Sequence, residues 1–158
     1  MLEIHKTVAK LYEDNKEYLE IFECLDEFSD TENFCNHYGF DIEDSCNAIL
    51  IKAKKPEEFY AMFCVLGANR LDVNHKAKEA MGAKRVSFAS RDEAELVTEQ
   101  IYGGISPLGL PENIKVFIDK NVIEREKLFI GAGNRVSKFF LSPKTLIKLS
   151  HAEVLDLT

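Results

Sequence analysis

The chain has 158 residues, of which 46% are hydrophobic and 30% are charged, and this balance is typical of a soluble globular domain. Its net charge of −7 argues against a broad nucleic-acid-binding surface, and DNA is not an expected partner. A small contact with one terminal nucleotide remains open. The sequence has neither an apolar run near the ~20 residues that span a bilayer nor a secretory apolar core at its start. We therefore expect a single cytoplasmic domain that binds no membrane.

The cysteines bear on compartment and on metal binding. Cys24, Cys35, Cys46 and Cys64 form no C-x-x-C pair, which favours buried free thiols in a reducing compartment. A zinc site built on Cys35, His37 and Cys46 is disfavoured because the ligand spacing is wrong and a fourth ligand is missing. We expect neither a metal nor a cofactor.

Hydrophobic periodicity and capping residues predict interspersed helices and strands. Ile4, Val8 and Leu11 lie at helical spacing, and the segment 90–93 is a capping box that opens another helix. Two apolar runs on either side of a Lys-Lys-Pro-Glu-Glu segment predict a hairpin of largely buried strands. In chain order we predict a helix over 3–19, a strand over 18–25, a helix over 29–39, strands over 48–51 and 59–66, a helix over 72–82, a strand over 84–88, a helix over 90–100, strands over 114–118, 128–130 and 138–141, a helix from 142–143, and a strand over 153–157.

These elements indicate an α+β fold. Several neighbouring strands are joined by connections too short for parallel crossovers, so the sheet is predicted to be mixed and mostly antiparallel, with flanking helices.

The segment 103–111 holds three glycines and two prolines in nine residues, which fixes an irregular backbone. Its bare N–H groups and the hydroxyl of Ser106 are able to face the oxygen atoms of a ligand. The alternative is a structural turn before the next strand. Because this loop follows a helix and not a strand, it is not the glycine-rich fingerprint that binds dinucleotides.

Four short segments occur in a characteristic order, namely 81–85, 103–109, 116–119 and 131–135. With them the chain resembles the YbaK / prolyl-tRNA synthetase-associated family of stand-alone or inserted aminoacyl-tRNA editing domains. The resemblance implies the α+β fold of that family, with a barrel-like sheet. It also implies one domain over 1–158, with a core over 30–157 and an N-terminal helix-and-strand extension over 1–28.

The resemblance also implies an activity. Members of the family hydrolyse the ester that joins a mischarged amino acid to the tRNA 3′ end, usually a small residue such as alanine or cysteine on tRNA-Pro. Water attacks with help from the ribose hydroxyl of the substrate, without a metal or a covalent nucleophile. The expected function is therefore a trans-acting aminoacyl-tRNA deacylase. Its expected partners are the aminoacyl-adenosine end of the tRNA and a synthetase.

Site residues are carried over by position from the family's motifs. N–H groups of the glycine loop would stabilise the oxyanion of ester hydrolysis. For Asp119 a strand-end cap remains an alternative, and for Arg135 a surface salt bridge. The expected catalytic residues are Asn47, Gly104 and Ser106, and the expected substrate-binding residues are Gly103, Ile105, Pro107, Asp119, Gly131, Gly133 and Arg135.

Asn47 departs from the family's pattern, which has a lysine at this position. In this respect the chain resembles a divergent branch of the family that carries asparagine there. An amide is neutral and offers two donors and one acceptor, whereas an ammonium is a point charge with three donors. Strand alternation places Lys52 and Lys54 on the face opposite Asn47, so we expect these two and Lys55 to form a solvated hairpin end or a local basic patch.

Three roles for Asn47 remain open: a hydrogen bond to the substrate in a deacylase of altered substrate choice, a contact in a non-catalytic module that binds aminoacyl-nucleotides or the tRNA 3′ end, or a structural cap. A regulatory module that docks through its N-terminal helix is a further alternative.

Overall fold

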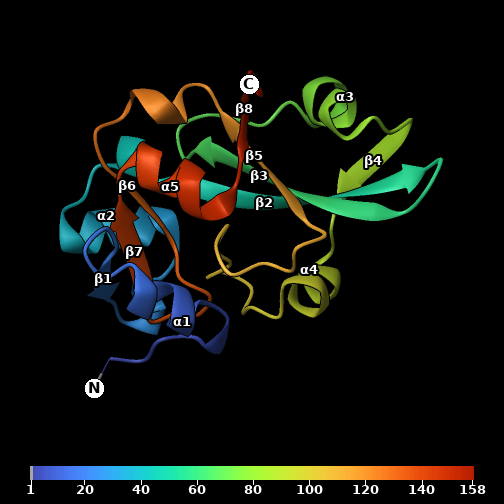
Figure 1. The fold of residues 1–158 in the computed structure, drawn as a ribbon. Coiled ribbons are helices and arrows are strands. Elements are labelled where there is room, and N and C mark those ends of the chain that lie inside the picture. The colour runs from blue at the N-terminus through green and yellow to red at the C-terminus, as the bar shows by residue number, and fades with distance from the viewer. Residues whose placement is uncertain (1) are drawn as a thin grey trace.

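The computed structural model describes residues 2–158 and contains two sheets, a three-stranded sheet of order β1-β7-β6 and a five-stranded sheet of order β4-β2-β3-β5-β8 (Figure 1). The strands are β1 (Glu20–Glu23), β2 (Cys46–Lys55), β3 (Phe59–Leu66), β4 (Arg85–Phe88), β5 (Lys115–Asp119), β6 (Leu128–Gly131), β7 (Ser137–Leu141) and β8 (Glu153–Leu155). The α-helices are α1 (Lys6–Asp14), α2 (Thr31–Tyr38), α3 (Lys78–Met81), α4 (Arg91–Thr98) and α5 (Pro143–Ser150).

The mixed, mostly antiparallel α+β architecture is confirmed. The β1–β7, β6–β7, β2–β3 and β2–β4 pairs are antiparallel, and the β3–β5 and β5–β8 pairs are parallel. The expectation of a barrel-like sheet is wrong, because the strands form two separate sheets that do not close.

The β2–β3 hairpin is confirmed, with β3 at its predicted bounds and a register that runs from Cys46 opposite Leu66 to Ala53 opposite Phe59. The helix predicted over 3–19 is wrong in its extent, since α1 ends at Asp14. The side chain of Asn15 donates to Leu11 O at 2.8 Å, which satisfies a carbonyl of the last turn and ends the helix. The strand predicted over 18–25 accordingly shortens to β1.

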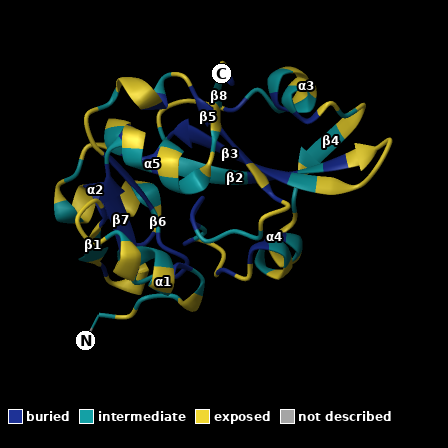
Figure 2. Cartoon of the chain, viewed as in Figure 1, coloured by how far each residue is buried: buried dark blue, intermediate teal, exposed yellow. Residues whose placement is uncertain are grey.

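Alternation along β3 builds two cores on opposite faces of the five-stranded sheet. Met62 and Cys64 pack into a core shared with α1, α4, α5 and the smaller sheet, whereas Phe63 and Val65 pack toward α3. Figure 1 shows α3 and α4 on opposite sides of this sheet, and Figure 2 shows β3 and β5 as its most deeply buried strands. The smaller sheet therefore lies beside the first core, where its strands meet the start of β2.

The N-terminal segment belongs to this packing. Val8 of α1 is fully buried in the first core, and β1 pairs with β7. Removing residues 1–28 would therefore open the core instead of detaching a docking arm.

The free thiols are confirmed, because all four cysteines are unpaired and buried. Among residues 2–158, no helix is both long and apolar enough to cross a membrane. Within the same residues, no three His, Cys, Asp or Glu side chains gather in a group able to hold a metal ion.

Glu93 ties α4 to the hairpin. It completes the predicted capping box with Ser90, and its carboxylate accepts from Lys52 Nζ and from the hydroxyl of Tyr60, both at 2.8 Å. The bond from Lys52, followed by those from the Ser90 backbone and Tyr60, lowers the pKa of Glu93 from 4.5 to about 2. Lys52 is thereby held in an ion pair and is not part of a solvated hairpin end.

This arrangement predicts a pH-dependent stability. Because the pKa of Glu93 is lower in the folded than in the unfolded chain, its contribution is complete above about pH 4.5 and is lost as the pH falls toward 2. We expect Glu93→Gln to lower Tm by a few degrees at pH 7, and the gap to wild type to narrow from pH 4.5 downward in thermal unfolding followed by circular dichroism. Glu57→Gln, at an exposed position of the hairpin loop, should follow wild type. A constant gap for Glu93→Gln across this range would contradict the ion-pair assignment.

Candidate active site

The glycine loop packs its backbone directly against the turn after β6. Gly133 N–H donates to Gly104 O at 2.7 Å. A Cβ on Gly104 would lie 1.9 Å from Asn134 O, and one on Gly131 would lie 2.4 Å from Ile105 O. Both positions therefore need glycine, and the loop and the turn form a single wall.

A pocket of about 310 Å³ opens beside this wall, between the starts of α2 and β2 and the strands β6 and β7. This volume is at the lower end of the range for sites that hold small molecules. The pocket is lined by Ser29, Asp30, Thr31, Cys46, Asn47, Ala48, Tyr102, Gly103, Gly104, Ile105, Gly131 and Lys138.

Asn47 presents its amide donors in this pocket. Its Oδ1 accepts hydrogen bonds from Thr31 Oγ1 and Ser45 Oγ, each at 3.3 Å. Two hydroxyl donors at Oδ1 fix the orientation of the amide. Its Nδ2 donates to no acceptor within residues 2–158, and its two N–H groups are therefore available to a ligand.

Lys138 lines the same pocket from β7. Ser45, just before β2, bridges to Phe129 of β6 in parallel, and Gly131 of β6 pairs with Lys138. A Cβ on Gly131 would meet the carbonyl oxygens of Gly104 and Ile105, so the glycine loop covers β6 at this point.

Lys138 is buried, with only 6% of its surface exposed. Its Nζ donates to Ser29 O at 2.8 Å and lies 5.0 Å from the centroid of the Phe34 ring. Burial lowers the pKa of this ammonium, and the nearby positive charge of Arg135 acts in the same direction.

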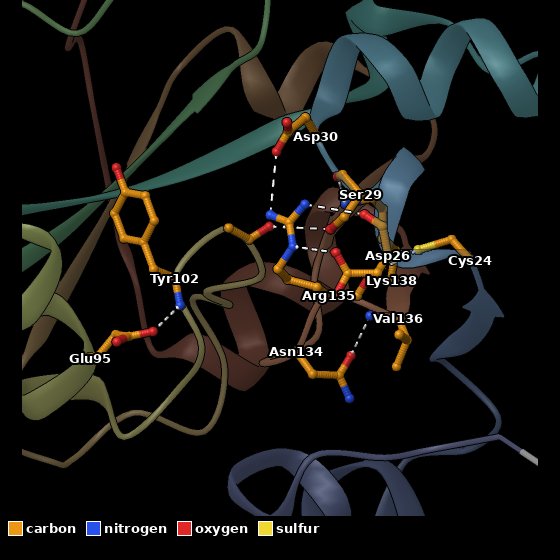
Figure 3. Close-up of polar contacts among 11 residues, drawn as sticks. Cys24, Asp26, Ser29, Asp30, Glu95, Tyr102, Asn134, Arg135, Val136 and Lys138 are labelled. Carbon is orange, nitrogen blue, oxygen red and sulfur yellow. Dashed lines mark hydrogen bonds and ion pairs between the residues drawn. The ribbon is translucent and has the colours of Figure 1, made fainter.

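Arg135 pairs with two aspartates beside the loop and is not among the residues that line the pocket (Figure 3). Its guanidinium is 3.0 Å from Asp26 Oδ1 and 3.4 Å from Asp30 Oδ1, and these carboxylates raise its pKa, the bond to Asp26 most. A Cβ on Gly103 would lie 2.2 Å from Arg135 Nη1, so the guanidinium packs against the bare glycine. Arg135 therefore forms the salt bridge that was the alternative to a substrate-binding role.

Two other residues of the loop turn away from the pocket. Ser106 is fully buried, its N–H donates to Gln100 Oε1 at 2.5 Å, and its Oγ accepts from Leu108 N at 3.1 Å. Pro107 lines a different cavity, formed with α1 and the end of α5.

Asp119 is also fully buried, at the end of β5. Its Oδ1 accepts from Leu157 N at 2.8 Å, and its Oδ2 has no hydrogen-bond partner among residues 2–158. With this bond Asp119 caps the end of the strand, which was the alternative to a substrate-binding role.

The structure thus brings five of the expected site residues together in one pocket and leaves the other five outside its lining. Inside are Asn47, Gly103, Gly104, Ile105 and Gly131, and outside are Ser106, Pro107, Asp119, Gly133 and Arg135.

Sequence reasoning missed Thr31, Tyr102 and Lys138. The available signal for Lys138 was a single charge in a buried strand, beside two phenylalanines. Such a charge is rarely buried without a partner or a function.

Comparison with known proteins assigns this chain to a family. A family model described as the aminoacyl-tRNA editing domain matches residues 26–149. An Enterococcus faecalis protein, EbsC, named as a candidate Cys-tRNA(Pro)/Cys-tRNA(Cys) deacylase, is 26% identical over 92 residues, which cover 58% of this chain and 56% of EbsC. Proline–tRNA ligase of Nautilia profundicola is 33% identical over 106 residues, which cover 66% of this chain and 18% of the ligase. The chain thus matches about half the length of the first relative and under a fifth of the second.

A crystal structure of a candidate trans-editing enzyme for prolyl-tRNA synthetase has the same fold. Its TM-score is 0.82, at 19% identity over 99% of both chains. The family match covers well over half of the sequence and confirms the resemblance drawn from its glycine motifs. The chain belongs to the aminoacyl-tRNA editing domain family.

Proposed function

We propose that this chain is a trans-acting aminoacyl-tRNA deacylase, which hydrolyses the ester of a mischarged tRNA and releases the amino acid. The observation that carries the proposal is the pocket that Asn47, with its unused amide donors, lines together with the backbone of the glycine loop. An ester carbonyl is the kind of acceptor that such donors bind. Membership of the editing-domain family supports the same substrate class.

The reaction needs only water and the groups that line the pocket. Water attacks the acyl carbon, and the carbonyl electron pair moves to oxygen, where hydrogen bonds from Asn47 Nδ2 stabilise it. The N–H groups of Gly103 and Ile105 donate to no acceptor within residues 2–158 and are further donors for this oxygen. The electron pair then re-forms the carbonyl as the bond to the ribose oxygen breaks. The ribose oxygen takes up one proton of the water, and the other is released as the amino acid leaves as a carboxylate. The hydroxyl of Ser106 takes no part, because it is turned inward.

Pocket size and surface charge indicate the substrate. A volume of about 310 Å³ accommodates an aminoacyl group, and the family resemblance favours a small side chain such as that of alanine or cysteine. One relative is named as a candidate deacylase of Cys-tRNA(Pro) and Cys-tRNA(Cys), and the other is named as a proline–tRNA ligase, so tRNA-Pro is the proposed carrier. Because its net charge is −7, the chain is proposed to contact only the 3′ end of the tRNA. We propose that a synthetase selects the tRNA.

A non-catalytic module that binds aminoacyl-adenosine is the second candidate. The observation that favours it is the neutral amide of Asn47 at the place where the family resemblance implies a lysine. The amide analogue of alanyl-adenosine, in which NH replaces the ester oxygen, separates the two functions. Binding of this analogue without release of any amino acid from charged tRNA would identify a binder.

The deacylase proposal predicts a specific effect at Asn47. Asn47→Asp keeps the oxygen that accepts from Thr31 and Ser45 and replaces the amide donors with a second acceptor. We expect kcat to fall about 10²–10³-fold, the usual cost of one lost oxyanion donor, in deacylation of tRNA-Pro charged with alanine or cysteine. Asn47→Lys should also change the rate.

Asn69→Asp makes the same chemical change in an exposed turn after β3 and should leave kcat unaltered. Indifference of the rate to both substitutions at Asn47 would assign that residue a structural role. Absence of release from every mischarged tRNA in a full panel would refute the deacylase function itself.

Tyr102 is proposed to stack on the terminal adenine. This residue lines the pocket and is 48% exposed, and its backbone is fixed by a bond from its N–H to Glu95 Oε2 at 2.8 Å. In Figure 3 the ring points away from the Arg135 cluster. Stacking of a base on an aromatic ring contributes ~1–3 kcal/mol. We therefore expect Tyr102→Ala to raise KM roughly tenfold or more and to change kcat little.

Tyr18→Ala is the matched control for this prediction. Tyr18 is also exposed and also carries a cation near its ring, at 5.9 Å for Lys148 against 5.5 Å for Arg91 at Tyr102, but it lies outside the pocket. An equal rise in KM for both variants would argue against stacking at Tyr102.

A further inference from the structure

Lys138 is a buried cation in the pocket that the reaction above does not use. An ammonium has three N–H donors, of which Ser29 O takes one. Within residues 2–158, Lys138 forms no salt bridge with a carboxylate, whereas Arg135 is paired with both Asp26 and Asp30. Lys138 therefore retains both its charge and unused donors at the pocket.

A buried charge without a counter-charge opposes folding, since desolvation is not repaid by an ion pair. The lowered pKa of Lys138 reflects this cost, because burial outweighs the opposing effects of its neighbours, Asp30 among them. A negative charge that forms inside the pocket would offset it, because electrostatic attraction is strong where water is excluded. The pocket is accordingly built to receive negative charge near Lys138.

We propose that Lys138 is a catalytic residue whose ammonium binds the acyl oxygen of the ester and stabilises the negative charge that develops there when water attacks. This inference rests on the proposed deacylase function and adds the group that supplies the positive charge. Asn47 and Lys138 line the same pocket. Asn47 accepts from Thr31 and Lys138 donates to Ser29 O, and these two partners lie two residues apart at the start of α2. No bond to Lys138 forms or breaks, and the electron pair on oxygen returns to the carbonyl as the ribose oxygen leaves.

The same charges orient the substrate. The α-ammonium group of an aminoacyl ester is repelled by Lys138 and attracted to a carboxylate. Asp30 lines the pocket with a side chain that is 69% exposed and is only loosely held by Arg135, at 3.4 Å. Positive Lys138 and negative Asp30 thus match the oxyanion and the α-ammonium group of one aminoacyl ester.

The test is deacylation by Lys138→Met, which removes the ammonium and keeps an apolar stem. Because a buried charge is removed together with its hydrogen bond, we expect Tm to stay within a few degrees of wild type. On the mischarged tRNA that wild type hydrolyses fastest, kcat should fall about 10²–10³-fold. Lys127→Met is the control, since its ammonium also lies over a ring, 5.4 Å from Phe140, but is exposed and paired with Glu20.

Each outcome decides the assignment. If wild type is active and folded Lys138→Met keeps kcat within about threefold, the role of Lys138 is refuted while the deacylase function stands. If wild type hydrolyses no charged tRNA, the deacylase function fails, and binding of the amide analogue of alanyl-adenosine decides the role of Lys138. At least about tenfold weaker binding by Lys138→Met then supports contact with the acyl oxygen, and equal binding refutes it. If Lys138→Met does not fold, Lys138→Gln replaces it in every comparison.

Discussion

The pocket depends on one close backbone contact, in which the loop 103–105 lies directly on the turn 131–134 without side chains between them. Gly104 and Gly131 allow it, because a Cβ at either position would overlap a carbonyl oxygen of the opposite segment. The contact fixes the loop's N–H groups beside β6. Groups from β2 and β7 line one pocket beside this contact. The absence of side chains at these two positions therefore creates the wall of the site.

Much of the fold was predictable because its signals are local. The bounds of β3, the hairpin and the capping box of α4 follow from apolar runs, a short connection and a Ser–Glu pair within four residues. The extent of α1 was not predictable from periodicity, which continued past Asp14 while the side chain of Asn15 ended the helix. The prediction of a closed, barrel-like sheet was wrong for a different reason. Whether strands form one sheet or two depends on long-range pairing, such as that of β1 with β7.

The site was predictable where the backbone defines it and not where side-chain direction does. The glycine-rich composition identified the loop at Gly103 and Gly104, and strand alternation correctly separated Lys52 from Asn47. Nothing local reveals that Ser106 turns inward, because its N–H is bound by Gln100 from the end of α4. Likewise the position of the Lys138 ammonium depends on its hydrogen bond to the carbonyl oxygen of Ser29, a residue 109 positions away in the sequence.

The distribution of charge around the pocket separates a structural cation from one that is available to a ligand. Arg135 is the more conspicuous in sequence, since it follows a glycine turn, yet its guanidinium is bonded to Asp26, lies near Asp30 and packs against Gly103. Lys138 looks like an ordinary strand residue, yet its ammonium is buried over Phe34 with a backbone carbonyl as its hydrogen-bond partner. A cation whose charge is matched within the fold gains little from an anionic ligand, whereas an unmatched buried cation gains much. The capacity to stabilise an oxyanion that we propose for this pocket therefore resides in Lys138 and in the neutral donors that line it, whereas Arg135 is held in ion pairs and packs against Gly103.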